Sequence, residues 1–142
     1  MPDTKTLDAF FADNGALLQK IMDALIPADP ERAMPSASEA GVLDRHLRAA
    51  LLRRDDLAPG FVLAVGRAAE LAPVDLDGLL TLSDTDFGLI SRVIAGAYFM
   101  NAEVNERLGY RGQSEMRETV DYDEIISLIE APVGRGDVYT HI

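Results

Sequence analysis

The chain has 142 residues, of which 48% are hydrophobic and 26% charged, a composition typical of one globular domain. Its formal net charge of −11 disfavours nucleic acids and anionic membrane surfaces as partners, unless a local basic patch overrides the total. The sequence has no cysteine, which excludes disulfides, thiolate catalysis and cysteine-bound zinc or iron–sulfur clusters.

The beginning of the chain, MPDTKTLDAFF, has one Lys, no basic segment before an apolar run and no twin-Arg pair. No apolar run approaches the roughly 20 residues that a membrane-spanning helix needs. We therefore expect a cytoplasmic protein without membrane insertion. A periplasmic location is expected only if the sequence has been trimmed or a partner carries the export signal.

The first predicted helix covers residues 14–26, NGALLQKIMDALI, where apolar residues recur at helical spacing. Asp13 or Asn14 is the predicted N-cap, and Pro27 ends the helix because the residue before a proline is pushed out of the α region. The preceding TLDAFFA is a lead-in turn or an extension of this helix, and we assign residues 1–12 as the lead-in.

A proline-rich stretch, PADPERAMPSAS, follows and predicts an ordered loop. Ser36 and Glu39 form an S-x-x-E capping box, which predicts that the second helix, SEAGVLDRHLRAALLRR, begins there. The next apolar run, FVLAVG, is compatible with a buried strand. A helix is preferred because Pro59 suits a first helical position and the residues after the run favour helix.

One helical turn is expected over residues 76–80, followed by a helix over residues 83–100, SDTDFGLISRVIAGAYFM. That helix is apolar on most sides, which is typical of the buried helix of a bundle. Gly88 and Gly96 are expected to let neighbouring helices approach closely. Asn101 is the predicted cap of a short turn, AEVNERL, which Gly109 ends in a left-handed conformation.

The remaining residues predict an acidic loop, a short helix in YDEIISLIEAP and an extended C-terminal arm, VGRGDVYTHI. The expected class is all-α, a single compact helical bundle with long loops. We assign one helical domain over residues 1–142, with the helical core at 13–113 and the loop, short helix and arm at 114–142.

No residue set in the sequence indicates a catalytic, cofactor-binding or metal site. His46 and His141 are far apart in sequence, and a structural or exposed role is expected for His46. Pairs of acids occur in polar segments, where they are expected to be exposed, whereas general acid–base work needs carboxyls in an apolar pocket. These acids are Asp55 with Asp56, Asp84 with Asp86, and Asp121 with Asp123 and Glu124.

The remaining chemical feature is apolar, and it suggests contact with another chain, because aromatic residues and Met are enriched in interface cores. For Phe99, burial in the domain's own core is preferred over an interface. For the segment from Tyr98 to Gln113, presentation to a partner and closure of the domain's own core carry equal weight. The arm is expected to pack on the partner, with Tyr139 as its anchor. The predicted partner-interface residues are Tyr98, Phe99, Met100, Tyr110, Arg111, Val138, Tyr139 and Ile142.

Three blocks in the sequence, ALIPADP, MPSASEAGVLDRHL and AYFMNAEVNERLGYRGQ, resemble the gluconate 2-dehydrogenase subunit 3 family in their order and spacing. The tail APVGRGDVYTHI also resembles the closing segment of such chains. The last two of the three blocks are the more specific, and the resemblance covers most of residues 21–113.

The resemblance implies a non-catalytic small subunit in a heterodimer with a large GMC-type (glucose–methanol–choline) flavoprotein, which holds FAD and oxidises a sugar or alcohol. Some complexes of this kind also contain a cytochrome c. This chain is then expected to hold no cofactor itself. It departs from the family in lacking a twin-Arg signal, which puts export and the cytochrome partner in doubt. Two alternatives stay open, a free-standing helical small-ligand-binding protein and a small enzyme that uses a carboxylate pair.

Overall fold

The computed structural model describes residues 3–110, 112, 123 and 126–128. By internal contacts the chain divides into two units, Met1–Arg111 and Gly112–Ile142, where the sequence predicted one domain. In the second unit, residue 123 and residues 126–128 are helical. The other residues of the predicted acidic loop, short helix and C-terminal arm lie outside the described part.

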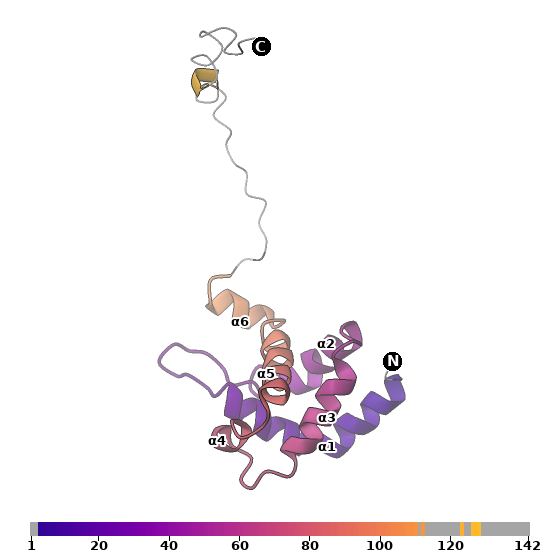
Figure 1. The fold of residues 1–142 in the computed structure, drawn as a ribbon. Coiled ribbons are helices and arrows are strands. Elements are labelled where there is room, and N and C mark those ends of the chain that lie inside the picture. Colours follow the sequence, from indigo (N-terminus) through magenta and orange to yellow (C-terminus); the bar gives the residue numbers. More distant parts are fainter. Residues whose placement is uncertain (1–2, 111, 113–122, 124–125, 129–142) are drawn as a thin grey trace, which may run out of the picture. The chain divides into compact units, whose positions relative to one another are not determined.

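The first unit is all-α, as predicted (Figure 1). The only β pairing among the described residues is one isolated bridge between Asp29 and Met34. In chain order the helices are α1 Thr4–Leu25, the π-helix η1 Val42–Leu47, α2 Arg48–Arg53, α3 Ala58–Ala68, α4 Leu76–Leu79, α5 Asp84–Tyr98 and α6 Ala102–Arg107.

Helix α5 is the central helix of this unit, because it packs against η1, α2 and α3. Its buried face includes Ile90 and Ile94, which join a continuous apolar core. Phe61 of α3 is the largest fully buried side chain, and its ring meets that of Phe10 edge-to-face at a centroid distance of 6.3 Å. The prediction that the helix over residues 83–100 is the buried one of the bundle is therefore confirmed.

Helix α1 begins at Thr4, so the assignment of a lead-in over residues 1–12 with a cap at Asp13 or Asn14 is wrong. The reason is packing, because Leu7 is fully buried and the rings of Phe10 and Phe11 lie against the core. Asn14 lies within the helix and donates from Nδ2 to the Phe10 carbonyl at 2.9 Å. The predicted end of the helix before Pro27 is correct.

The capping box forms, but it does not begin an α-helix. The Ser36 Oγ accepts from the Glu39 N–H at 3.2 Å, and Glu39 accepts from the Ser36 N–H at 2.9 Å. Gly41 follows with φ +66°, a left-handed conformation that an α-helix cannot continue through. The box therefore closes a separate turn, and the helix restarts at Val42 as a π-helix before becoming α2.

Helix α3 forms from the FVLAVG stretch, with Pro59 in its first positions, so the preference for a helix over a strand is confirmed. The close approach of helices lies at Gly60, where an added Cβ would be 2.8 Å from Leu89 Cδ2. Gly88 and Gly96 have open space at the same position, so the close approach predicted for them is wrong. Which glycine faces a neighbour depends on how α3 and α5 cross, and this is not visible in either helix alone.

The later helix starts agree with the sequence. The Ser83 hydroxyl caps α5, and the Asp75 carboxylate caps the single turn of α4. The Asn101 Oδ1 accepts from two backbone N–H groups at the start of α6. Gly109 has φ +72°, the left-handed residue expected after that helix.

Candidate functional site

The end of α5 holds the long loop after α1 in place through Tyr98. The Tyr98 hydroxyl donates to the Pro35 carbonyl at 2.8 Å, and Tyr98 is only 4% exposed. Burial raises the pKa of this hydroxyl. Tyr98 therefore belongs to the domain's own core, which corrects its inclusion among the predicted interface residues.

Two side chains around α6 bind the same loop. The Asn101 Nδ2 donates to the Ala40 carbonyl at 2.7 Å, while its Oδ1 caps α6. Arg107 donates to the Ala33 carbonyl and forms an ion pair with Glu103 one turn earlier. The blocks of residues 24–47 and 97–113, which carry the family resemblance, are thus in direct contact, and part of the second block serves to fix the first.

The bound loop also has hydrogen bonds of its own, as its prediction as an ordered loop requires. Asp29 and Met34 exchange two backbone hydrogen bonds of 2.9 Å each. The Arg32 guanidinium donates to the Asp29 carboxylate at 2.7 Å and lowers the pKa of that carboxyl. Ala33 has φ +52°, an uncommon left-handed conformation for a residue other than glycine, and it is the residue whose carbonyl Arg107 binds.

An apolar surface lies next in sequence to Tyr98, Asn101 and Arg107, the residues that bind this loop. Phe99, Leu108 and Tyr110 are 52%, 53% and 58% exposed, and together with Asn105 they line an open hollow of about 430 Å³. Asn105 supports it, because its Nδ2 donates to the Phe99 carbonyl and its own carbonyl accepts from the Tyr110 N–H, both at 2.8 Å. We call these four residues the Phe99 surface.

The structure thus brings together two predicted interface residues, Phe99 and Tyr110, and adds two that the sequence did not indicate, Asn105 and Leu108. The preference for Phe99 as a core residue is wrong, because its ring is half exposed. Met100 is half-buried and lies next to the surface in sequence. The remaining predicted interface residues lie outside the described part of the chain, and these are Arg111, Val138, Tyr139 and Ile142.

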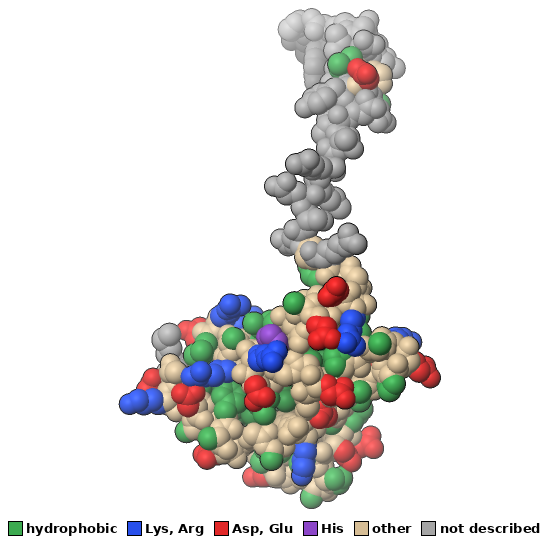
Figure 2. All heavy atoms as spheres, turned by 180° about the vertical axis from the view of Figure 1, so that it is seen from behind, with side chains coloured by type: hydrophobic (Ala, Val, Ile, Leu, Met, Phe, Trp, Pro, Cys, Tyr) green, Lys and Arg blue, Asp and Glu red, His purple; other side chains and the backbone are tan. Residues whose placement is uncertain are grey.

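Acidic side chains are spread over the face of the first unit that Figure 2 shows, but the acids predicted to be exposed differ in their surroundings. Asp86 is only 8% exposed and accepts from Arg67 Nη1 at 2.6 Å, so its prediction as an exposed acid is wrong. Asp55 and Asp84 are exposed, and His46 is half-buried. Among the described residues, no three His, Cys, Asp or Glu side chains gather as a metal site would require. The predicted acids and histidine outside the described residues are Asp121, Glu124 and His141.

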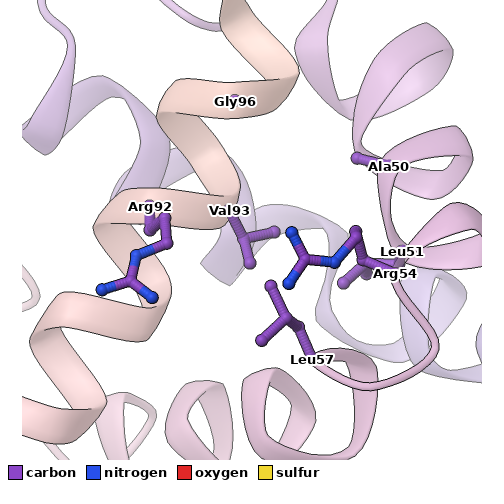
Figure 3. Close-up of a pocket in the computed structure, with 7 residues that line it drawn as sticks. All are labelled: Ala50, Leu51, Arg54, Leu57, Arg92, Val93 and Gly96. Atoms are coloured by element: carbon purple, nitrogen blue, oxygen red, sulfur yellow. The ribbon is translucent and has the colours of Figure 1, made fainter. Parts of the chain in front are cut away.

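A second apolar hollow, of about 110 Å³, lies between α2 and α5 (Figure 3). Its walls are apolar, and two arginines stand at its edge. In Figure 3 the terminal nitrogens of Arg54 point across the hollow toward Val93, whereas the Arg92 guanidinium points away from it. The lining residues are Ala50, Leu51, Arg54, Leu57, Arg92, Val93 and Gly96.

Within the part of the chain that the structure describes, no helix is long and apolar enough to cross a membrane. Comparisons of the chain with family models, with curated proteins and with solved structures found no match.

Proposed function

We propose that this chain is the non-catalytic accessory subunit of a large FAD-dependent GMC-type flavoprotein that oxidises a sugar or alcohol. The observation that supports this proposal most directly is the Phe99 surface, which lies within one of the two blocks that resemble the small-subunit family more specifically. A chain that only closed its own core would not need Phe99, Leu108 and Tyr110 half exposed side by side.

The Phe99 surface has the properties expected of a binding site for another protein. Aromatic residues are enriched in the cores of protein interfaces, and a few such side chains contribute most of the binding energy. Burying one Leu or Phe side chain stabilises a complex by about 1.5–3 kcal/mol. The hydrogen bonds of Asn105 fix the backbone at Phe99 and Tyr110 before a partner arrives, which reduces the backbone entropy lost on binding.

In this proposal the oxidation chemistry lies wholly in the partner. The flavin supplies hydride acceptance there, and this chain contributes shape and stability. A cytochrome c is a further partner only if the complex is exported.

The proposal predicts that a gene for a large GMC-type flavoprotein subunit lies beside the gene for this chain, and the test is co-expression of the tagged full-length chain with that subunit. We expect a flavin-absorbing complex to elute with the tag. Phe99→Asp and Tyr110→Asp should each reduce the recovered flavin at least tenfold, since each places a carboxylate in an apolar contact. Leu63→Asp is the matched control, because Leu63 on α3 is 62% exposed but lies outside the Phe99 surface.

Two results would contradict the proposal. One is the absence of any complex with the flavoprotein while the tagged chain remains folded. The other is flavin bound to this chain alone, or dehydrogenase activity without a partner. If Leu63→Asp weakens the complex as much as the two test variants, the binding site is not the Phe99 surface.

The alternative of a small-ligand-binding protein is favoured by one specific observation, the hollow between α2 and α5. A small-ligand-binding protein needs an apolar pocket, and this hollow has apolar walls with two exposed arginines at its edge.

A further inference from the structure

The hollow between α2 and α5 exists because two facing positions carry almost no side chain. Ala50 on α2 and Gly96 on α5 both line it, and a Cβ added at Gly96 would meet no atom within 4 Å. Leu51, Leu57 and Val93 supply the apolar walls. The hollow has a volume of about 110 Å³ and is partly open to solvent, so a compact apolar group can enter it.

Arg54 has hydrogen-bonding capacity left on the side that faces the hollow. Its Nε and Nη2 donate to the two carboxylate oxygens of Asp56, both at 2.8 Å. A guanidinium has five N–H donors, so this pairing uses one edge and leaves the edge formed by the two terminal nitrogens. No hydrogen bond from Arg54 Nη1 to another described residue is present, and Figure 3 shows the terminal nitrogens directed toward Val93.

The local charge at this place is close to neutral, although the chain as a whole is strongly acidic. Residues 44–56 contain four arginines and three aspartates. Arg48 pairs with Asp8 of α1 and Arg54 pairs with Asp56, while the Arg92 guanidinium on α5 points away from the hollow. The surroundings of Arg54 therefore differ in charge from the chain's total of −11.

From these three observations we propose that the hollow is a binding site for a small monocarboxylate with a compact apolar body. The carboxylate accepts two hydrogen bonds from the terminal nitrogens of Arg54, and the apolar body lies against Leu51, Leu57 and Val93. The site is independent of the Phe99 surface and does not rest on the proposed partner.

The test is a titration of the isotope-labelled full-length chain, followed by amide chemical shifts in NMR, with benzoate as the probe. We expect shifts concentrated in α2 and α5 and a dissociation constant of about 1 mM, as for other small fragments. Benzamide and benzylamine have the same ring without the carboxylate, and acetate has the carboxylate without the ring. All three should bind at least tenfold more weakly than benzoate.

Two pairs of variants locate the site. Arg54→Gln should weaken benzoate binding at least tenfold, whereas Arg53→Gln, its exposed neighbour outside the hollow, should leave it unchanged. Gly96→Val should abolish binding by filling the space, whereas Gly88→Val, at another open glycine of α5, should not. The spectrum of each free variant shows whether it is folded.

The proposal is wrong if benzoate causes no localised shifts, if benzamide or benzylamine binds as well as benzoate, or if Arg54→Gln in a folded chain keeps the wild-type affinity. It is also wrong if Gly96→Val folds and still binds benzoate. If Arg53→Gln weakens benzoate binding as much as Arg54→Gln, the attraction is general electrostatics and the proposal of a defined site is wrong. An equal loss of binding in Gly96→Val and Gly88→Val would also contradict it.

Discussion

Replacement of Asn101 by Ala is expected to lower the free energy of unfolding by about 2 kcal/mol, because the side chain forms two separate kinds of hydrogen bond. Its Oδ1 accepts from the N–H groups of Glu103 and Val104 and so caps α6. Its Nδ2 donates to the Ala40 carbonyl at 2.7 Å and joins α6 to the loop 61 residues earlier in the chain.

The two contributions have similar sizes. Loss of an N-cap costs about 1 kcal/mol, and loss of a hydrogen bond between neutral groups costs about 1 kcal/mol more. Asn101→Asp separates them, because a carboxylate still caps the helix and suits its positive N-terminal end, but it cannot donate to the Ala40 carbonyl. We therefore expect Asn101→Asp to cost about 1 kcal/mol, the value of the loop contact alone.

The measurement is urea unfolding of the full-length chain at neutral pH, followed by far-UV circular dichroism. Ser83→Ala is the control, since Ser83 caps α5 through its hydroxyl and should lose only about 1 kcal/mol. Asn101→Asp with wild-type stability would show that the contact with Ala40 contributes nothing. If Asn101→Ala lowers the free energy of unfolding no more than Ser83→Ala does, the two contributions of Asn101 do not add.

Four further substitutions test other parts of the first unit by the same unfolding measurement. Ser36→Ala should cost about 1 kcal/mol through the lost capping box, and an unchanged midpoint would show that the hydroxyl is not the cap. Gly66→Ala should stabilise α3 by up to about 1 kcal/mol through helix propensity, whereas Gly60→Ala should gain less or destabilise, because its Cβ would lie 2.8 Å from a methyl group of α5. If Gly60→Ala gains as much stability as Gly66→Ala, α3 and α5 can move apart at no cost in free energy. Tyr98→Phe should cost about 1 kcal/mol by leaving a loop carbonyl unpaired. Burial raises the pKa of Tyr98, so its contribution is complete below the unfolded value of about 10 and is lost as pH rises through the folded value. The alkaline loss of stability should therefore be smaller in Tyr98→Phe, and an equal loss would contradict a buried tyrosine that is neutral when folded.

Features that depend on residues close together in sequence could be predicted from the sequence. The predicted cap at Asn101 and the predicted left-handed Gly109 each involve groups within one helical turn of one another. The position of Pro59 and the helical propensity around it were enough to prefer a helix over a strand for α3. The all-α class follows from the same local signals taken together.

The Phe99 surface could not be predicted from residues close together in sequence. Tyr98 and Phe99 are adjacent, and successive residues of a helix point about 100° apart, so both rings cannot face the same neighbour. Tyr98 lies on the buried face of α5 with Ile90 and Ile94, and its hydroxyl donates to the Pro35 carbonyl of the loop after α1. Only the tertiary structure shows that this contact, 63 residues away in the chain, lies at Tyr98 and that Phe99 is left half exposed.

The sequence by itself therefore determined the helical class, most helix ends and the absence of a recognisable catalytic motif, because propensities, caps and prolines act over a few residues. Only the tertiary structure decided that α1 begins at Thr4, that Gly60 is the point of close approach, and that Asp86 is buried against Arg67. It also decided that α2 and α5 leave a hollow between them. Each of these depends on how helices distant in sequence pack together, and packing is set by the shapes of both partners at once.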